Sequence, residues 1–206
     1  MTQVPAPVLD GILELVNIGI GRSAGSLHTL IGRHVTLHVP DVSIMRAQEL
    51  KEQFSQSFPA FFMVSQEYSG AFAGTMVLMF PKESAQSLFQ LLTGESELTP
   101  CNAELWKITL LEVGNILVNG VMGSITNVLE KKITFHLPVY QEGTLKPLRD
   151  FSWIADSEYV VVAHAMFSVE EENIQGEIYV LLADQAIEVL ATSINEKMGT
   201  DCTKTL

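Results

Sequence analysis

The stretch Glu14-Leu15-Val16-Asn17-Ile18 returns 98 residues later as Glu112-Val113-Gly114-Asn115-Ile116. A proline follows each stretch at the same distance, because Pro40 and Pro138 are also separated by 98 residues. A constant offset across a helix-like segment and the segment after it indicates an internal repeat. We therefore expect the two halves of the chain to contain the same elements in the same order.

Hydrophobic periodicity predicts one series of elements in each half. In the first half, it predicts a helix over residues 8–30, strands over 35–39, 61–66 and 71–80, and a helix over 83–92. In the second half, it predicts a helix over residues 103–129, strands over 133–137, 159–169 and 175–182, and a helix over 185–194. The last two strands of each half are expected to form hairpins, which turn at residues 67–70 and 170–173.

These elements predict one α/β (α+β) domain over residues 1–206, made of two half-repeats at about 8–94 and 102–197. Hairpin signals outnumber βαβ signals, so the sheet should be mixed and largely antiparallel. Neither half has an obvious way to cover all of its apolar strands. One domain with internal pseudo-two-fold symmetry is therefore favoured over two independent ones.

Composition limits the classes of partner. Of the 206 residues, 47% are apolar and 17% are charged, and the formal net charge is −12. A basic patch is the usual footprint of nucleic-acid binding, so this balance argues against nucleic acid and against an anionic membrane surface. No signal peptide and no apolar stretch long enough to span a bilayer are expected, which predicts a cytoplasmic protein.

The polar residues of the first helix form a stripe. Asp10, Glu14 and Asn17 are spaced i, i+4 and i+7, which places them on one helical face. The second helix repeats this stripe with Glu112 and Asn115, followed by Asn119, but carries Ile108 in place of the first acid. Both stripes are expected to be exposed to solvent while the apolar residues of the helices are buried.

An exposed carboxamide can donate and accept hydrogen bonds at once, and it can therefore hold a water molecule in line with an electrophile. A carboxylate one turn away can pair with a cation on a partner. No activated nucleophile, metal-ligand cluster or phosphate-cradling loop accompanies these residues, so no metal or nucleotide is expected to bind the chain itself. The stripe suits a reaction whose remaining groups come from a partner.

The spacing Asp10-x3-Glu14-x2-Asn17-x22-Pro40 resembles the signature of the CheC/CheX/FliY family of phosphatases that act on phosphorylated CheY. The second copy matches this signature except at Ile108. The length and the two-copy layout look most like CheC. FliY-like proteins would be expected to carry a further switch-complex domain, for which the chain offers no room.

The resemblance implies roles for these residues. Asn17 and Asn115 would orient the attacking water, while Glu14 and Glu112 would pair with a lysine of the regulator, and Asp10 would support the first site. The phosphoaspartate and Mg²⁺ would belong to a CheY-like response regulator, and CheD would be a further partner. Two alternatives are a catalytically weak module that sequesters the phosphorylated regulator or works through CheD, and a structural component of the flagellar switch.

Overall fold

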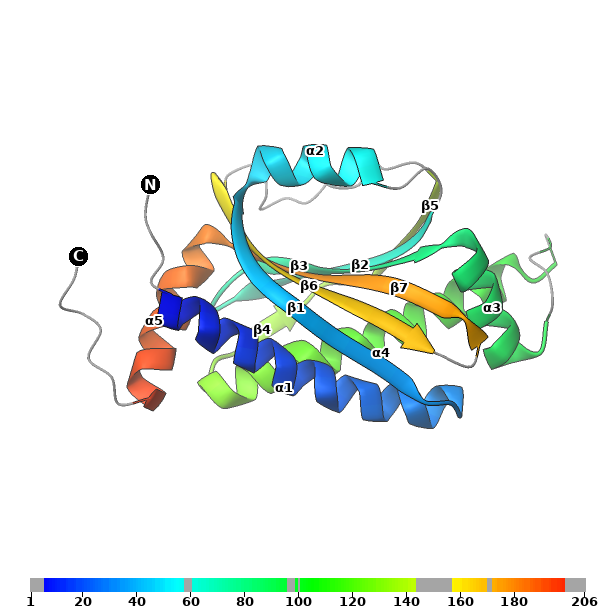
Figure 1. Ribbon diagram of the computed structural model, residues 1–206, viewed down its shortest axis with the longest axis horizontal. Helices are drawn as coiled ribbons and strands as arrows, with labels where there is room; N and C mark the ends of the chain where they lie inside the picture. Colours follow the sequence, from blue (N-terminus) through cyan, green and yellow to red (C-terminus); the bar gives the residue numbers. More distant parts are fainter. Residues whose placement is uncertain are drawn as a thin grey trace.

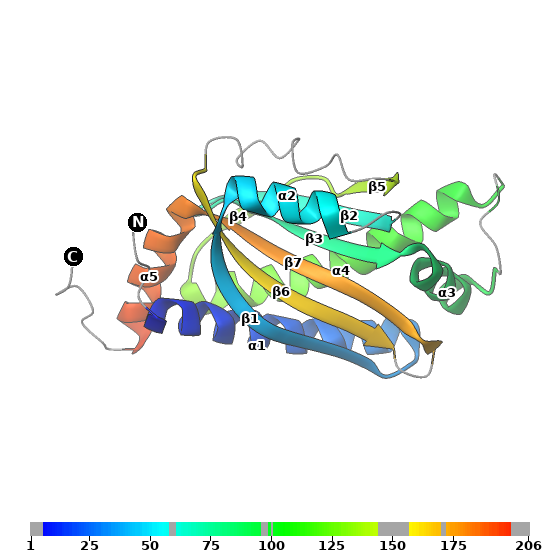
Figure 2. The ribbon, with the colours of Figure 1, turned by 45° about the horizontal axis from the view of Figure 1, so that its top comes forward.

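Two long helices, α1 (Ala6–Ile31) and α4 (Ala103–Leu129), lie side by side against one face of a sheet, and the short helix α2 (Ala47–Ser57) lies over the other face (Figure 1, Figure 2). Helices α3 (Lys82–Thr93) and α5 (Asp184–Met198) lie at opposite ends of the molecule (Figure 1). The structure is a computed structural model, and it describes residues 6–57, 61–95, 99, 101–143, 157–169 and 172–198.

The strands of the sheet come from both halves of the chain. They are β1 (Val35–Arg46), β2 (Phe61–Gly70), β3 (Gly74–Pro81), β4 (Ile133–Phe135), β5 (Val139–Gly143), β6 (Tyr159–Val169) and β7 (Ile174–Ala183). Their order is β1-β6-β7-β3-β2-β4, and β5 also pairs with β2. Each of these strand pairs is antiparallel, which confirms the predicted α+β fold with a largely antiparallel sheet.

The strand order reads the same from either edge when the two halves are exchanged. The first strand of each half pairs with the hairpin of the other half: β1 pairs with β6, and β4 and β5 pair with β2. The inner strands β3 and β7 meet at the centre of the sheet. Each half therefore depends on the other for its sheet, as a pseudo-two-fold repeat would require. The duplication itself stays an inference from the sequence.

The two prolines of the repeat lie at matching irregularities. Strand β1 contains Pro40 and has one residue more than β6 where the register shifts between His38 and Asp41. In the second half, Pro138 lies in the gap between Phe135 and Val139, where the chain again has one residue more than the stretch of β2 opposite. Proline cannot donate a hydrogen bond to a sheet, so it is tolerated at such bulges.

The main core fills the space between the helix pair and the sheet. Trp106, at the start of α4, packs its ring against Phe62 and Phe89 with centroid distances of 4.9 Å and 4.8 Å.

Helix α4 is long and apolar enough to cross a membrane by length and composition, so the expectation that no segment reaches that length was wrong. Half of the apolar window of α4 is buried within the fold, because this helix packs against both α1 and the sheet.

Several element boundaries differ from the prediction. Strand β1 continues through Pro40 to Arg46, and the strand expected over residues 133–137 is split into β4 and β5. Helix α2 was not predicted. The turn expected at residues 67–70 was wrong, because Tyr68 is buried and its hydroxyl donates to the Leu181 carbonyl 2.9 Å away, which keeps β2 extended to Gly70. Residues 170 and 171 of the second expected turn lie outside the described residues.

Candidate functional site

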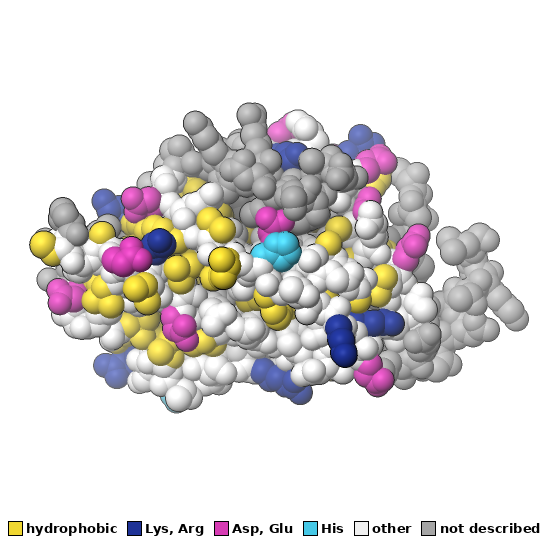
Figure 3. Space-filling view, turned by 180° about the vertical axis from the view of Figure 1, so that it is seen from behind, with side chains coloured by type: hydrophobic (Ala, Val, Ile, Leu, Met, Phe, Trp, Pro, Cys, Tyr) yellow, Lys and Arg dark blue, Asp and Glu magenta, His cyan; other side chains and the backbone are white. Residues whose placement is uncertain are grey.

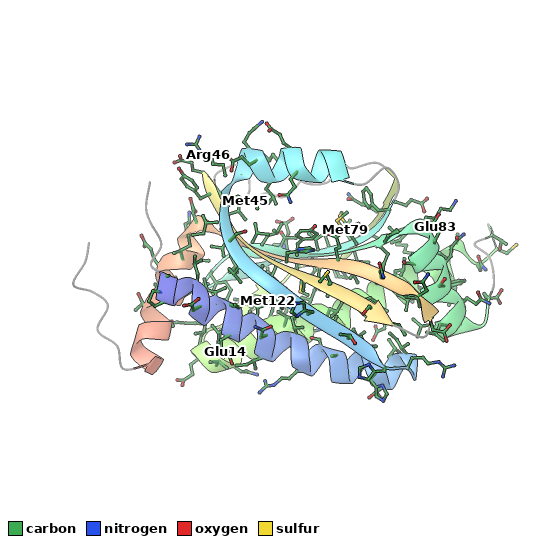
Figure 4. All side chains as sticks on the ribbon, in the orientation of Figure 1. Glu14, Met45, Arg46, Met79, Glu83 and Met122 are labelled. Carbon is green, nitrogen blue, oxygen red and sulfur yellow. The ribbon has the colours of Figure 1, made fainter. Side chains whose placement is uncertain are left out.

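The polar stripe of α1 faces solvent, as the helical spacing predicted. Asp10, Glu14 and Asn17 are exposed, and Glu14 lies on the outer side of the helix pair, away from the sheet (Figure 4). The apolar residues between them are buried in the core, so the core fixes the position of the helix that carries the stripe. The buried positions of this helix are Val8, Ile12, Leu15, Val16, Gly19, Ile20, Ser23, Leu27 and Ile31.

The stripe of α4 is also accessible. Glu112 is exposed and Asn115 is half-buried, while Val113 and Gly114 between them are buried. A Cβ built on Gly114 would come within 2.5 Å of the Val64 side chain, so the glycine lets α4 lie close to the sheet. The neighbouring glutamate and asparagine are thereby presented on the opposite, solvent-facing side.

Small residues hold α1 and α4 together. A Cβ on Gly19 would lie 2.6 Å from Val121 Cα, and a Cβ on Gly120 would lie 2.1 Å from Ser23 Oγ. The Ser23 hydroxyl also donates to the Leu117 carbonyl at 3.3 Å. The contacts of residue 19 with 121 and of residue 23 with 117 show that the helices run antiparallel.

This antiparallel contact sets the distance between the two sites. The contacts join residues 19–23 of α1 to residues 117–121 of α4, and each asparagine of interest precedes the middle of its own segment by four residues. At about 1.5 Å per residue and about 9 Å between helix axes, the backbones of Asn17 and Asn115 are roughly 15 Å apart. The sites are therefore separate, and each has its own stretch of surface.

The two sites differ in their neighbours. At the second site, Asn119 Nδ2 donates to Asn115 Oδ1 over 2.8 Å. The matching position on α1 is Gly21, and within the part of the chain that the structure describes, the Asn17 amide has no side-chain hydrogen bond.

The surface one turn before each glutamate differs as well. Asp10 is exposed on α1, whereas on α4 the side chains of Ile108 and Leu105 are 54% and 44% exposed. Viewed from behind, apolar side chains gather over the end of the molecule that holds α3 and the start of α4 (Figure 3). The exposed Leu105 was missed by the sequence reasoning, although its i, i+3 spacing to Ile108 continues the stripe.

A perturbed carboxylate lies on the opposite face of the sheet. The imidazole of His164, with its Nε2 3.2 Å from Glu177 Oε2, and the hydroxyl of Tyr179 hold the pKa of Glu177 below its ordinary value, although burial acts in the other direction. Tyr179 belongs to the smaller hydrophobic core, which lies between α2 and this face of the sheet. Among the described residues, no three His, Cys, Asp or Glu side chains are grouped as metal ligands would be.

Comparison with known proteins finds a relative by sequence. The chain is 25% identical over 131 residues to the flagellar motor switch phosphatase FliY of Bacillus subtilis, and the match covers 63% of this chain. The chain spans about a third, 34%, of the length of that relative. No protein-family model matches the sequence.

Solved structures share the fold. The crystal structure of Thermotoga maritima FliY matches with a TM-score of 0.74 at 22% identity, covering 96% of this chain and 100% of that one. CheX from Vibrio vulnificus matches with 0.56 at 15% identity, covering 82% and 99%. The FliG–FliM complex from Helicobacter pylori matches with 0.61 at 15% identity, covering 92% and 100%. The sequence relative and the shared fold support the resemblance of this chain to the CheC/CheX/FliY family.

Proposed function

We propose that this protein is a cytoplasmic phosphatase that removes the phosphoryl group from a phosphorylated CheY-like response regulator. The observation that supports the proposal most is the placement of the two Glu-x-x-Asn pairs. Both pairs are accessible to solvent on the outer side of α1 and α4, and the helices beneath them are anchored in the core. The type of the protein within the family, for which the two-copy layout favours CheC, stays a prediction.

In this reaction the chain mainly positions the attacking water and the docked regulator. Phosphoryl transfer is catalysed mainly by alignment and charge neutralisation, and the regulator supplies the phosphoaspartate and Mg²⁺. The amide of Asn17 or Asn115 holds a water molecule whose oxygen attacks phosphorus, while the bond between phosphorus and the aspartyl oxygen breaks. A proton of that water passes to the phosphate, and the products are inorganic phosphate and the regulator's carboxylate.

The glutamates act in docking. Glu14 and Glu112 lie one turn before the asparagines, where each can pair with the active-site lysine of the regulator and set the register of the complex. Because both are exposed, each pairing is worth about 0.2–1 kcal/mol, which corresponds to a change of up to roughly fivefold in affinity. The asparagine amide therefore determines the rate of hydrolysis, and the glutamate carboxylate contributes part of the affinity for the regulator.

A binding module is the second candidate, and the apolar surface beside Glu112 is the observation that favours it. Ile108 and Leu105 expose apolar area that hydrolysis does not require. The likeness to FliM, which forms a complex with FliG in Helicobacter pylori, fits a protein that binds a partner without chemistry. In this reading the chain sequesters the phosphorylated regulator or acts through CheD.

Phosphate release separates the two candidates. Purified protein is added to a radiolabelled, phosphorylated CheY, and loss of label is followed together with binding. Loss faster than the regulator's own decay supports the phosphatase, whereas binding without acceleration supports the module. A Glu14→Gln and Glu112→Gln double variant should raise the KM severalfold with little change in kcat, and Glu188→Gln on the exposed face of α5 is the matched control.

A further inference from the structure

The carboxamide of Asn115 is held by its own helix. Asn119, one turn further along α4, donates from Nδ2 to Asn115 Oδ1 over a distance of 2.8 Å. Both residues belong to the outward stripe, and Asn115 is half-buried beside the exposed Asn119. A side-chain bond between positions i and i+4 is a local contact that forms without any other element of the fold.

This bond restrains the Asn115 amide. A carboxamide has two donor hydrogens on nitrogen and two acceptor sites on oxygen. When Oδ1 accepts from Asn119, the nitrogen is turned away from Asn119, and both of its hydrogens and one acceptor site on oxygen remain available. Turning the Asn115 amide alone would place two amino groups against each other, so the bond couples the orientation of Asn115 to that of Asn119.

The first site lacks this arrangement. Gly21 is the counterpart of Asn119, because the two positions are 98 residues apart. Within the described residues, the Asn17 side chain has no hydrogen-bond partner, so no bond among these residues restrains its two side-chain torsions. A Cβ built on Gly21 meets nothing within 4 Å, so this position could accept a side chain without displacing its surroundings.

We infer that Asn119 is a positioning residue of the second site, which fixes the rotamer of Asn115 before the regulator docks. The inference rests on the proposed phosphatase function. Ordering a free polar side chain costs up to about 1–2 kcal/mol of conformational entropy, and a bond formed in advance removes part of that cost from the catalytic step. The second site thus has a preorganised asparagine, whereas it lacks the acid that Asp10 provides in the first site, because Ile108 stands at that position.

The test isolates each site by removing the amide of the other. In an Asn17→Ala background, Asn119→Ala should lower kcat for phosphate loss about threefold to tenfold and leave KM nearly unchanged. Asn119→Gln retains an amide donor and should restore most of the rate. In an Asn115→Ala background, Gly21→Asn should raise the kcat of the first site, whereas Gly21→Ala should not.

The matched control removes a bond of the same kind elsewhere. Gln48 Nε2 donates to Glu52 Oε1 at 2.9 Å on α2, which covers the other face of the sheet, so Gln48→Ala should leave both constants unchanged (Figure 1). A readout independent of activity is the ¹⁵N order of the Asn115 side-chain amide. In Asn119→Ala it should fall to the level of the Asn17 amide.

Three results would overturn the inference. The first is an Asn115 amide that stays ordered in Asn119→Ala. The second is a kcat that does not respond to Asn119→Ala although wild-type protein is active. The third is an amide order that falls as expected in a protein that never accelerates phosphate loss; this result refutes the proposed function and with it the role of Asn119 in catalysis.

Discussion

Gly19 of α1 lies directly against the backbone of Val121 in α4, where an added Cβ would come within 2.6 Å of Val121 Cα and 2.8 Å of its carbonyl oxygen. The obstacle is main chain, so it cannot rotate away as a side chain could. This contact brings the two helices that carry the Glu-x-x-Asn pairs to a fixed separation. It lies two residues, about half a turn, from Asn17, which is exposed on the other side of the same helix.

Gly19→Ala should therefore destabilise the protein. Overpacking a tight contact typically costs about 1–3 kcal/mol, and the loss should be visible as a lower midpoint in urea. Gly21→Ala is the control, since its added Cβ meets nothing within 4 Å and alanine favours the helix by up to about 1 kcal/mol. Equal stability of the two variants would show that the helices separate easily and that the close contact is unimportant.

The first position of each stripe should tune docking rather than chemistry. In an Asn17→Ala background, Ile108→Asp gives the second site the acid that Asp10 provides on α1, and a surface charge of this kind should lower the KM up to roughly fivefold with kcat unchanged. A rise in KM would be the contrary result. It would show that the exposed Ile108 is itself a docking contact and would favour the binding module.

Glu177 should make stability depend on pH. His164 and Tyr179 lower the pKa of Glu177 from its ordinary value of 4.5, so its contribution is present above about pH 4.5 and is lost as the pH falls through the lowered pKa. Glu177→Gln should therefore reduce the free energy of unfolding by roughly 1 kcal/mol at pH 7, allowing for partial exposure. Denaturant titrations should show the difference shrinking below pH 4.5. A difference that is the same at pH 7 and pH 3.5 would contradict this reading, and the exposed Glu188→Gln serves as the control.

Local patterns predicted much of the fold. Helix α4 and strand β6 begin and end where hydrophobic periodicity placed them, because each is a long, strongly patterned segment. Pro40 was read as the end of a strand, but a bulge accommodates it and β1 continues. Pairing between the halves could not be read from the sequence, since β1 and β6 meet through residues as distant as Val35 and Val169, and periodicity carries no information on which strands become neighbours.

The candidate site was predicted in part for a similar reason. Helical spacing is a local property, so it correctly placed Glu14, Asn17 and Glu112 on exposed faces. The bond between Asn119 and Asn115 depends on side-chain rotamers, which spacing does not determine. The repeat shows that Gly21 and Asn119 occupy equivalent positions. The role of Asn119 could be inferred only from its hydrogen bond to Asn115 in the structure.

The central claim is that the amides of Asn17 and Asn115 position the attacking water, and one measurement tests it most directly. Phosphate loss from a phosphorylated CheY is followed with wild-type protein, Asn17→Ala, Asn115→Ala and the double variant. Losing the amide costs on the order of a hundredfold at its own site, so each single variant should keep the activity of the other site. Less activity should remain in Asn17→Ala, because only the first site carries the supporting acid, Asp10. The double variant should approach the regulator's own decay rate while still binding it. A double variant with full activity would contradict the account.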